Sequence, residues 1–287
     1  MKTLKLAALL IWALIITIFS SCNHYSEDES INLLSYNIRF DNPDDGLNSW
    51  SNRKEKVAAL IRFHDVGIAC LQEVLHHQLI DLDKRLPNLS WVGVGRDDGK
   101  QQGEYSPILY DNQKFKLLDS GWFWLSDTPD VPSIDWDAAC VRICTWVKLK
   151  HLANSIELFV FNTHFDHVGE IARQNSAQLI IHKINEIAQG YPLVLAGDFN
   201  VSPNSDPIKT IAEKFFDSYL VSDEPPYGPI GTWNAFDFNS TLDQRIDFIF
   251  TNERINVIKY ANLSDSEDQR FPSDHLPVFA KVSFNEL

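Results

Sequence analysis

The segment LVLAGDFN, residues 193–200, decides the fold of this 287-residue chain. Four apolar residues are followed at once by Gly197, Asp198, Phe199 and Asn200. A short apolar run of this kind is typical of a buried strand. A carboxylate placed directly at its end is costly unless it is paired or bound to a cation. The segment therefore predicts an α/β fold with chemistry at the carboxyl end of a strand.

The same arrangement of an apolar strand with a polar end recurs along the chain. One strand pattern contains Asn37, and the next, after a helical pattern, leads into Glu73. Later, a strand pattern leads into His164, a helical pattern follows, and the next strand ends at Asp198. The two pairs are 36 and 34 residues apart. We therefore predict two related βαβ units that deliver polar groups to one place, because strand ends of α/β folds meet the ligand.

The rest of the chain also alternates between strands and helices. Asp206-Pro207 predicts a helix start, with Asp206 as the N-cap and Pro207 at N1. Residues 31–287 contain no low-complexity linker, which indicates one domain of layered α/β architecture. The predicted helices cover 50–61, 75–86 and 177–187, and the predicted strands cover 31–38, 66–71, 108–110, 121–125, 141–149, 156–162, 193–196, 246–250 and 277–284.

Residues 1–22 have the pattern of an export signal. Lys2 and Lys5 precede an apolar-rich run, Leu6 to Phe19, which is too short to span a bilayer comfortably. Ser20-Ser21-Cys22 then predicts a bacterial lipoprotein, with Cys22 lipidated and residues 23–30 as a tether. Cleavage by an ordinary signal peptidase nearby, or an uncleaved anchor, are the alternatives. We expect an exported protein, periplasmic or attached to the outer membrane or cell surface, that meets the membrane only through its lipid.

Charge and cysteine content narrow the class of substrate. The formal net charge is −14, and nucleic acid is the less expected partner because non-specific binding to it depends on Lys and Arg. A small phosphorylated substrate and a monomeric state are expected. With Cys22 lipidated, Cys70, Cys140 and Cys144 remain, an odd number that excludes complete pairing within the chain. We expect free, largely buried thiols.

Carboxylates at the ends of apolar segments predict a divalent metal ion. Glu73 alone would more often be a salt-bridge partner, but Asp198, Asp247 and Asp274 recur in similar positions. Four such groups would repel one another without a cation. Oxygen ligands favour Mg²⁺ or Mn²⁺ over zinc.

The order of these motifs resembles the endonuclease/exonuclease/phosphatase superfamily, which includes DNase I-like nucleases, sphingomyelinases and inositol polyphosphate phosphatases. The resemblance covers residues 31–285 and implies a four-layer αββα sandwich with two mixed β-sheets. It depends on Ser-Tyr-Asn-Ile at 35–38, Leu-Gln-Glu-Val at 71–74, Asn-Thr-His at 162–164, Gly-Asp-Phe-Asn at 197–200, Arg-Ile-Asp-Phe at 245–248 and Ser-Asp-His-Leu-Pro at 273–277.

The resemblance implies a role for each motif residue around the metal and the attacking water. Glu73 is the direct metal ligand, Asn37 lies beside it, and Asp274 contacts the metal or its waters. Asp198 orients and deprotonates the water. Asn200 helps it and steadies the phosphoryl oxygens.

Other residues are implied to meet the phosphate. His275, paired with Asp247, acts as an acid/base or charge stabiliser, and His164 provides a second imidazole. Glu104 supports His164 and Arg142 contacts phosphate, although a simple ion pair on a strand face is the alternative for both. Two aromatic residues in a loop before the Asp247 strand are expected to line the cleft, namely Trp233 and Phe236.

These features predict a divalent-metal-dependent hydrolase, a phosphatase or phosphodiesterase, that acts on a small phosphorylated molecule. Metal and cationic donors stabilise the charge that in-line displacement at phosphorus builds. One alternative is an extracellular endonuclease. Another is a binding protein on an inactive scaffold, against which the intact set of Glu73, Asp198, Asp247 and His275 argues.

Overall fold

A computed structural model describes residues 29–285. Two six-stranded mixed sheets form its centre, as the resemblance implied. The predicted signal peptide, Cys22 and residues 23–28 of the predicted tether lie outside the described residues. No helix within residues 29–285 is long and apolar enough to cross a bilayer.

The first sheet has the strand order β11-β12-β1-β2-β4-β3. Only β1 and β2 pair in parallel, and α2 connects them. Its strands are β1 (Ile31–Asn37), β2 (Ile68–Gln72), β3 (Leu89–Val92), β4 (Ile108–Asp111), β11 (Ile255–Asn262) and β12 (Val278–Phe284), and its helical elements are η3 (Pro43–Asn48), α2 (Trp50–Phe63) and α3 (His76–Arg85).

The second sheet has the order β5-β6-β7-β8-β10-β9 and repeats this plan. Only β7 and β8 are parallel, and α4 connects them, so the two predicted βαβ units are confirmed. Its strands are β5 (Phe115–Trp124), β6 (Ile143–His151), β7 (Glu157–His164), β8 (Leu193–Asp198), β9 (Phe216–Asp217) and β10 (Asp247–Thr251), and its helices are α4 (Glu170–Ile187), α5 (Asp206–Ala212) and α6 (Ser218–Val221).

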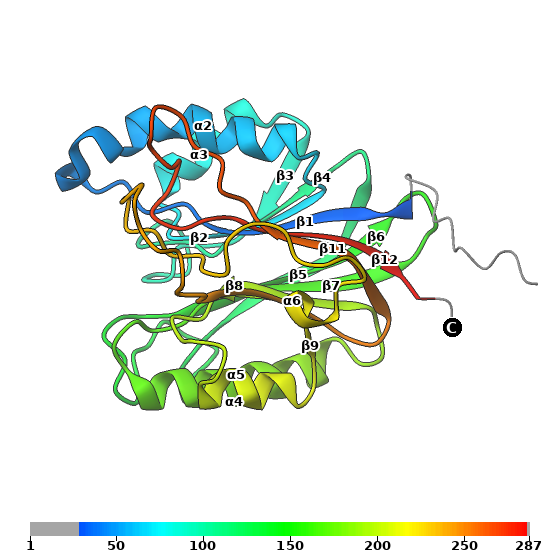
Figure 1. The fold of residues 1–287 in the computed structure, drawn as a ribbon. Helices are drawn as coiled ribbons and strands as arrows, with labels where there is room; N and C mark the ends of the chain where they lie inside the picture. Colours follow the sequence, from blue (N-terminus) through cyan, green and yellow to red (C-terminus); the bar gives the residue numbers. More distant parts are fainter. Residues whose placement is uncertain (1–28, 286–287) are drawn as a thin grey trace, which may run out of the picture.

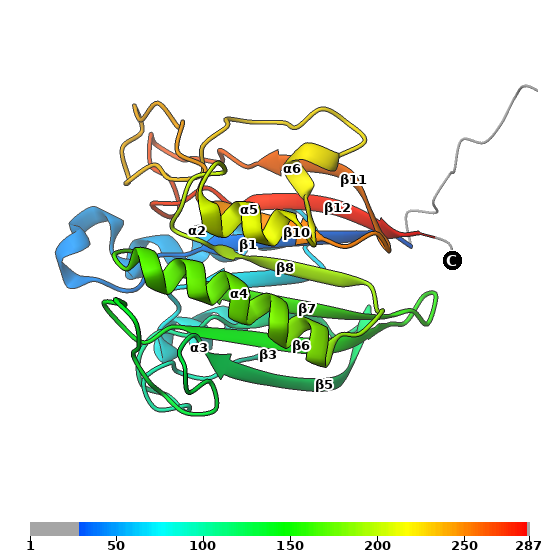
Figure 2. The same cartoon turned by 90° about the horizontal axis from the view of Figure 1, so that it is seen from below.

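The sheets pack face to face, with α2 and α3 outside the first and α4 and α5 outside the second (Figures 1 and 2). Three clusters of buried side chains hold these layers together. One contains residues from both sheets, such as Leu33 and Val160, and fills the space between them. The second joins α2 and α3 to the first sheet, and the third joins α4 and α5 to the second. Burial of this apolar area is the main stabilising contribution to the fold.

Polar side chains also connect the two sheets at the end where the site lies. Asn162 on β7 donates from Nδ2 to the carbonyl oxygens of Leu71 and Pro107, at 2.7 and 2.8 Å. Its Oδ1 accepts from Nε2 of Gln72 at 2.7 Å. All of these groups are buried, where a satisfied hydrogen bond avoids the desolvation cost of an unpaired polar atom. The relative position of β2 and β7 is thereby fixed.

Several local predictions were wrong. The N-cap of α5 is Ser205 and not Asp206, which lies one position inside the helix. The short edge strands β3 and β9, together with β11, were not predicted. Cys140 lies before β6 and is only partly buried, whereas Cys70 and Cys144 are buried, free thiols as expected.

Candidate active site

The carboxyl ends of the two parallel strand pairs meet at one end of the sandwich. His164 and Asp198 are direct register partners on β7 and β8, and Asp247 on β10 is the antiparallel partner of Asp198. Across the sandwich, Nδ2 of Asn37 donates to Oδ2 of Asp198 and to Oε1 of Glu73, both at 3.0 Å. One buried amide therefore connects the polar groups of both sheets.

Glu73 lies one residue beyond β2, with a φ of 60°. Its Oε2 accepts from the backbone N–H of Phe40 at 3.1 Å. The residue is partly exposed, so the carboxylate is held by two donors and can still be reached from the cavity. This is a suitable position for a metal ligand, because the remaining lone pairs of the carboxylate stay available.

Asp274 approaches Glu73 from the loop before β12. The Ser273 hydroxyl donates to the carbonyl oxygen of Asn37 at 2.7 Å, which fixes this loop against β1. Buried Arg53 also joins the two segments, since Nη1 donates to the carbonyl oxygens of Ile38 and Pro272. Burial raises the pKa of Asp274. The positive charge of His275 lowers it, but the neighbouring Glu73 raises it further, and the net shift is upward.

Asp198 is almost completely enclosed. Only 1 % of it is exposed, its Oδ1 accepts from the backbone N–H of Asn200 at 2.9 Å, and Nε2 of His275 lies 3.8 Å from its Oδ2. Burial and the nearby Asp247 raise the pKa of Asp198 to about 7. A carboxylate of this kind can accept a proton from water near neutral pH.

His275 forms a buried pair with Asp247, whose Oδ2 lies 2.9 Å from Nδ1 of the imidazole. Burial lowers the pKa of His275, but the charges of Asp247 and Asp198 outweigh this and raise it well above its usual value. The backbone N–H of Asp247 donates to the hydroxyl of Thr232 at 3.2 Å, which fixes the start of β10. The imidazole is therefore cationic at neutral pH and presents Nε2–H toward Asp198.

His164 differs from His275 in its electrostatics. Burial and the positive charges of Arg142 and Arg96 lower the pKa of His164 well below its usual value. Its Nε2 lies 3.0 Å from Nδ2 of Asn200 and 3.4 Å from Oδ2 of Asp198. The site therefore combines one neutral and one charged imidazole.

A cavity of about 490 Å³ opens onto this centre. Its walls come from both sheets and from the loops that follow their strands. They include most of the predicted site residues, namely Glu73, Glu104, Arg142, His164, Asp198, Asn200, Trp233, Asp274 and His275. Asn37 and Asp247 lie behind them, fully buried.

Two predictions are not met by the geometry. Glu104 does not support His164: it accepts from Nη1 and Nη2 of Arg96 at 2.8 and 2.9 Å, while the buried Nδ1 of His164 has no partner within residues 29–285. The ion-pair alternative therefore describes Glu104. Phe236 does not line the cavity and packs over the guanidinium of Arg53, 5.3 Å from the ring centre.

Sequence reasoning missed four polar residues of the cavity wall: Arg39, Arg96, His167 and Gln244. Arg39 lies two residues after Asn37 and His167 three after His164, so proximity to a motif was the available signal. Arg39 pairs with Asp45 and its Nε lies 3.8 Å from Oδ2 of Asp274. Gln244 directly precedes the Arg-Ile-Asp-Phe motif and carries the same signal, whereas Arg96 lies in a loop that is distant in sequence from every motif.

The donor set fits a divalent cation. Glu73, Asp274 and the buried amide of Asn37 offer oxygen atoms, and the negative charge of Glu73 contributes to the raised pKa of Asp274. A second group, Asp198, Asp247 and His275, has ligand atoms within 4.8 Å of one another, although Asp247 and His275 already bind each other. A cation would neutralise this concentration of negative charge.

The chain resembles known proteins over most of its length. The model of the Endonuclease/Exonuclease/phosphatase family matches residues 34–275. A Bacteroides vulgatus endonuclease/exonuclease/phosphatase structure is 42 % identical, with a TM-score of 0.86, and covers 89 % of this chain and 99 % of its own. A Bacteroides thetaiotaomicron mannosyl-6-phosphatase structure is 39 % identical, with a TM-score of 0.85, covering 88 % and 100 %. The yeast 3′-5′-exoribonuclease subunit Ccr4 of the CCR4-Not complex is 20 % identical over 82 % of this chain but only 35 % of its own length.

The chain belongs to the Endonuclease/Exonuclease/phosphatase family, whose members hydrolyse phosphoesters and generally depend on a divalent metal. The layered fold and the cluster of Asp and His side chains are both consistent with this family. The protein is therefore a phosphoester hydrolase, as its sequence predicted.

Proposed function

We propose that this protein is a Mg²⁺- or Mn²⁺-dependent phosphatase or phosphodiesterase of a small phosphorylated molecule, with a phosphorylated sugar as the leading candidate. One observation carries the proposal. A single amide, Nδ2 of Asn37, connects Glu73, a reachable carboxylate, to Asp198, a sequestered one. The hydrogen bonds support a cation ligand and a base that act at the same point of one cavity.

Glu73, Asn37 and Asp274 would hold the metal. When bound, a divalent cation supplies Lewis-acid stabilisation of the negative charge that develops on the phosphoryl oxygens. The hard oxygen donors support Mg²⁺ or Mn²⁺ over zinc.

The protein side chains supply proton transfer and orientation. Asp198 accepts the proton of the attacking water, since its pKa of about 7 allows it to act near neutral pH. Protonated His275, held by Asp247, donates from Nε2 to the oxygen on which charge accumulates. The neutral His164 and the amide of Asn200 lie beside them and orient the phosphoryl group.

The size and charge of the molecule support a small substrate. A cavity of about 490 Å³ is within the usual range for small-molecule sites. The net charge of −14 disfavours a long polyanion. The similar mannosyl-6-phosphatase supports a phosphorylated sugar, and the exposed ring of Trp233 at the cavity wall could stack on one.

An exonuclease activity is the second candidate. It is favoured by the relatedness to a 3′-5′-exoribonuclease subunit. Stepwise hydrolysis of single-stranded RNA from its 3′ end, lost in Asp198→Ala, would establish it in place of the first proposal, whereas nicking of plasmid DNA would indicate an endonuclease.

We further propose that residues 31–287 form a monomeric catalytic domain of an exported lipoprotein, periplasmic or on the outer membrane or cell surface, attached through Cys22. The support is the sequence pattern of residues 1–22. Metabolic labelling with a radioactive or clickable fatty acid, lost in Cys22→Ser, tests the attachment. An unlabelled wild-type chain would contradict it.

The function itself is tested with residues 23–287 on a panel of sugar phosphates, inositol phosphates, lipid head-group diesters and nucleic acids. Each is assayed with Mg²⁺, with Mn²⁺ and with EDTA. We expect metal-dependent release of phosphate from a sugar phosphate, strongly reduced in Glu73→Gln. A folded protein that turns over no phosphoester would revive the inactive scaffold.

A further inference from the structure

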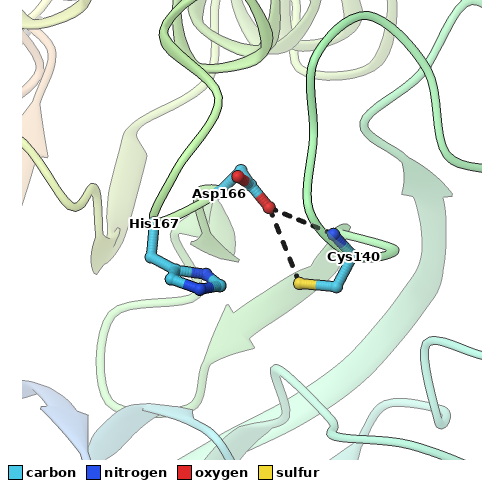
Figure 3. A group of neighbouring side chains, drawn as sticks. All are labelled: Cys140, Asp166 and His167. Carbon is cyan, nitrogen blue, oxygen red and sulfur yellow. Dashed lines mark hydrogen bonds between the residues drawn. The ribbon is translucent and has the colours of Figure 1, made fainter.

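One wall of the cavity is built from loops outside the catalytic centre. Arg142 comes from the segment before β6, and Asp166 and His167 from the loop between β7 and α4. Arg142, His167 and Cys140 line the cavity, whereas Asp166 is only 1 % exposed and lies behind them. Figure 3 shows the side chains of His167 and Cys140 on the same side of Asp166.

Asp166 is the fixed point of this wall. Its Oδ1 accepts from the backbone N–H groups of Val168 and Gly169, at 2.9 and 2.8 Å. Its Oδ2 accepts from those of Ala139 and Cys140, at 3.0 and 3.3 Å. Although burial raises the pKa of Asp166, these donors and Arg142 hold it far below its usual value. The carboxylate is therefore ionised and ties the two loops together.

Arg142 lies beside this carboxylate, but some N–H groups of its guanidinium have no hydrogen-bond acceptor in the described part of the chain. The residue is 5 % exposed, and its Nε lies 3.6 Å from Oδ2 of Asp166. Neither Nε nor Nη1 forms a hydrogen bond within residues 29–285. A buried guanidinium with unused N–H groups in a cavity wall points to an anionic ligand.

The contact between Arg142 and His167 fixes the tautomer of the histidine. Nη2 of Arg142 lies 3.0 Å from Nδ1 of His167. Because a guanidinium cannot accept a hydrogen bond, Nδ1 is the acceptor, and the neutral ring carries its proton on Nε2. His167 is exposed to the cavity. The pair therefore offers the cavity the Nε2–H of His167, with the guanidinium charge of Arg142 directly beside it.

We infer that Arg142 and His167 form a subsite for the third non-bridging oxygen of a phosphate monoester and so select monoesters over diesters. The inference rests on the proposed function and sharpens it. A bound phosphodiester has two non-bridging oxygens, and His275, His164 and Asn200, together with a metal ion when bound, would provide for them. A monoester has a third, which needs its own donors. His167 is thus a substrate-binding residue, and Asp166 positions Arg142 for it.

The same wall could be considered as a metal site, because Cys140, Asp166 and His167 have ligand atoms within 4.8 Å of one another. Two facts argue against this. Both oxygens of Asp166 are already occupied by backbone N–H groups. The guanidinium of Arg142 also borders Asp166 and His167, so the positive charge that a metal would bring is already present.

A matched pair of variants at His167 tests the subsite. In His167→Asn the amide oxygen can replace Nδ1 as acceptor for Arg142, but the side chain is too short to replace Nε2–H. In His167→Gln the longer amide reaches the position of Nε2. With p-nitrophenyl phosphate, we expect kcat/KM to fall about tenfold in His167→Asn, because one hydrogen bond to a charged ligand is lost. In His167→Gln, kcat/KM should stay within about threefold of the wild type. With methyl p-nitrophenyl phosphate, both should stay within about twofold of the wild type.

In His167→Asn, the affinity for inorganic phosphate as a competitive inhibitor should fall in parallel with kcat/KM for the monoester. The melting temperature should be unchanged. Equal losses on the monoester and the diester, or no loss on either, would overturn the subsite. So would stoichiometric Zn²⁺ binding that both Cys140→Ser and His167→Asn remove. If the wild type hydrolyses no phosphoester, the proposed function fails by itself. Calorimetric binding of phosphate to the wild type and His167→Asn then still decides the subsite.

Discussion

The two βαβ units share a plan but present their acids differently. In the unit of β7, α4 and β8, Asp198 is the last residue of its strand, pairs in register with His164 and is 1 % exposed. In the unit of β1, α2 and β2, the register partner of Asn37 is Gln72, and Glu73 lies one residue beyond the strand with a positive φ. A single-residue difference therefore separates a sequestered carboxylate from a reachable one.

The difference shows how one architecture can supply two chemical roles. Burial raises the pKa of Asp198 and gives it the properties of a base. Glu73 is partly exposed and is held by a backbone N–H and by Asn37. It keeps lone pairs for a cation. In the proposed mechanism, proton transfer and metal binding are thus divided between the units.

The largest effect is expected for Asp198→Asn, which keeps the shape but removes the base. We expect kcat to fall about 10⁴-fold, in the upper range for loss of a general base in a buried site. Added Mg²⁺ or Mn²⁺ should not restore turnover. Partial rescue by metal would show that Asp198 acts mainly as a ligand, and the contrast between the units would be lost.

Glu73→Gln should cost somewhat less, about 10³-fold in kcat/KM, through weakened metal binding. Excess metal should recover part of the rate. Calorimetric titration with Mn²⁺ checks the cause directly, with Asp198→Asn as the matched control. Unchanged Mn²⁺ affinity would contradict the role of Glu73 as the reachable ligand.

Asp247→Asn should lower kcat/KM about 10²-fold and move its pH dependence. In the proposed mechanism, activity requires ionised Asp198 and protonated His275, so we expect it to rise with pH through about 7 and to fall again as His275 loses its proton. Asp247 raises the pKa of both groups. Its removal should shift both limbs of the profile to lower pH. If the low-pH limb of the profile did not move, the pKa of Asp198 would not depend on the charge of Asp247, and this prediction would be wrong.

The smallest effect is expected for Gln72→Leu, at the position before Glu73. Its counterpart before Asp198 is Gly197, where an added Cβ would meet the carbonyl oxygen of Thr163. Gln72 instead hydrogen-bonds Asn162 across the sandwich. We expect a loss of about 1–3 kcal/mol in the free energy of unfolding, because Asn162 is left with a buried acceptor. Urea denaturation measures it, and Asn162→Leu in the same background should cost more again, because the carbonyl oxygens of Leu71 and Pro107 then lose their donor.

Much of the fold could be predicted because its signals are local. The runs 31–38 and 193–196 are apolar over a strand length, and the helix that became α2 has its buried residues on one face. The edge strands β3 and β9 could not be predicted, since they are short and owe their conformation to β4 and β10, respectively. Asp206 was assigned the N-cap because Pro207 follows it. The assignment was wrong because Ser205, its neighbour, is an equally good capping residue by type, so residue type alone does not decide between them.

The sequence by itself determined the family, the paired units and the identity of Asn37, Glu73, Asp198, Asp247 and His275, because each lies in or next to an apolar strand whose end is fixed by local pattern. Only the tertiary structure decided that Glu104 pairs with Arg96, that Phe236 covers Arg53, and that Arg142 fixes the tautomer of His167. Those contacts join loops whose approach depends on how the layers pack. Periodicity and spacing carry no information about such contacts between loops.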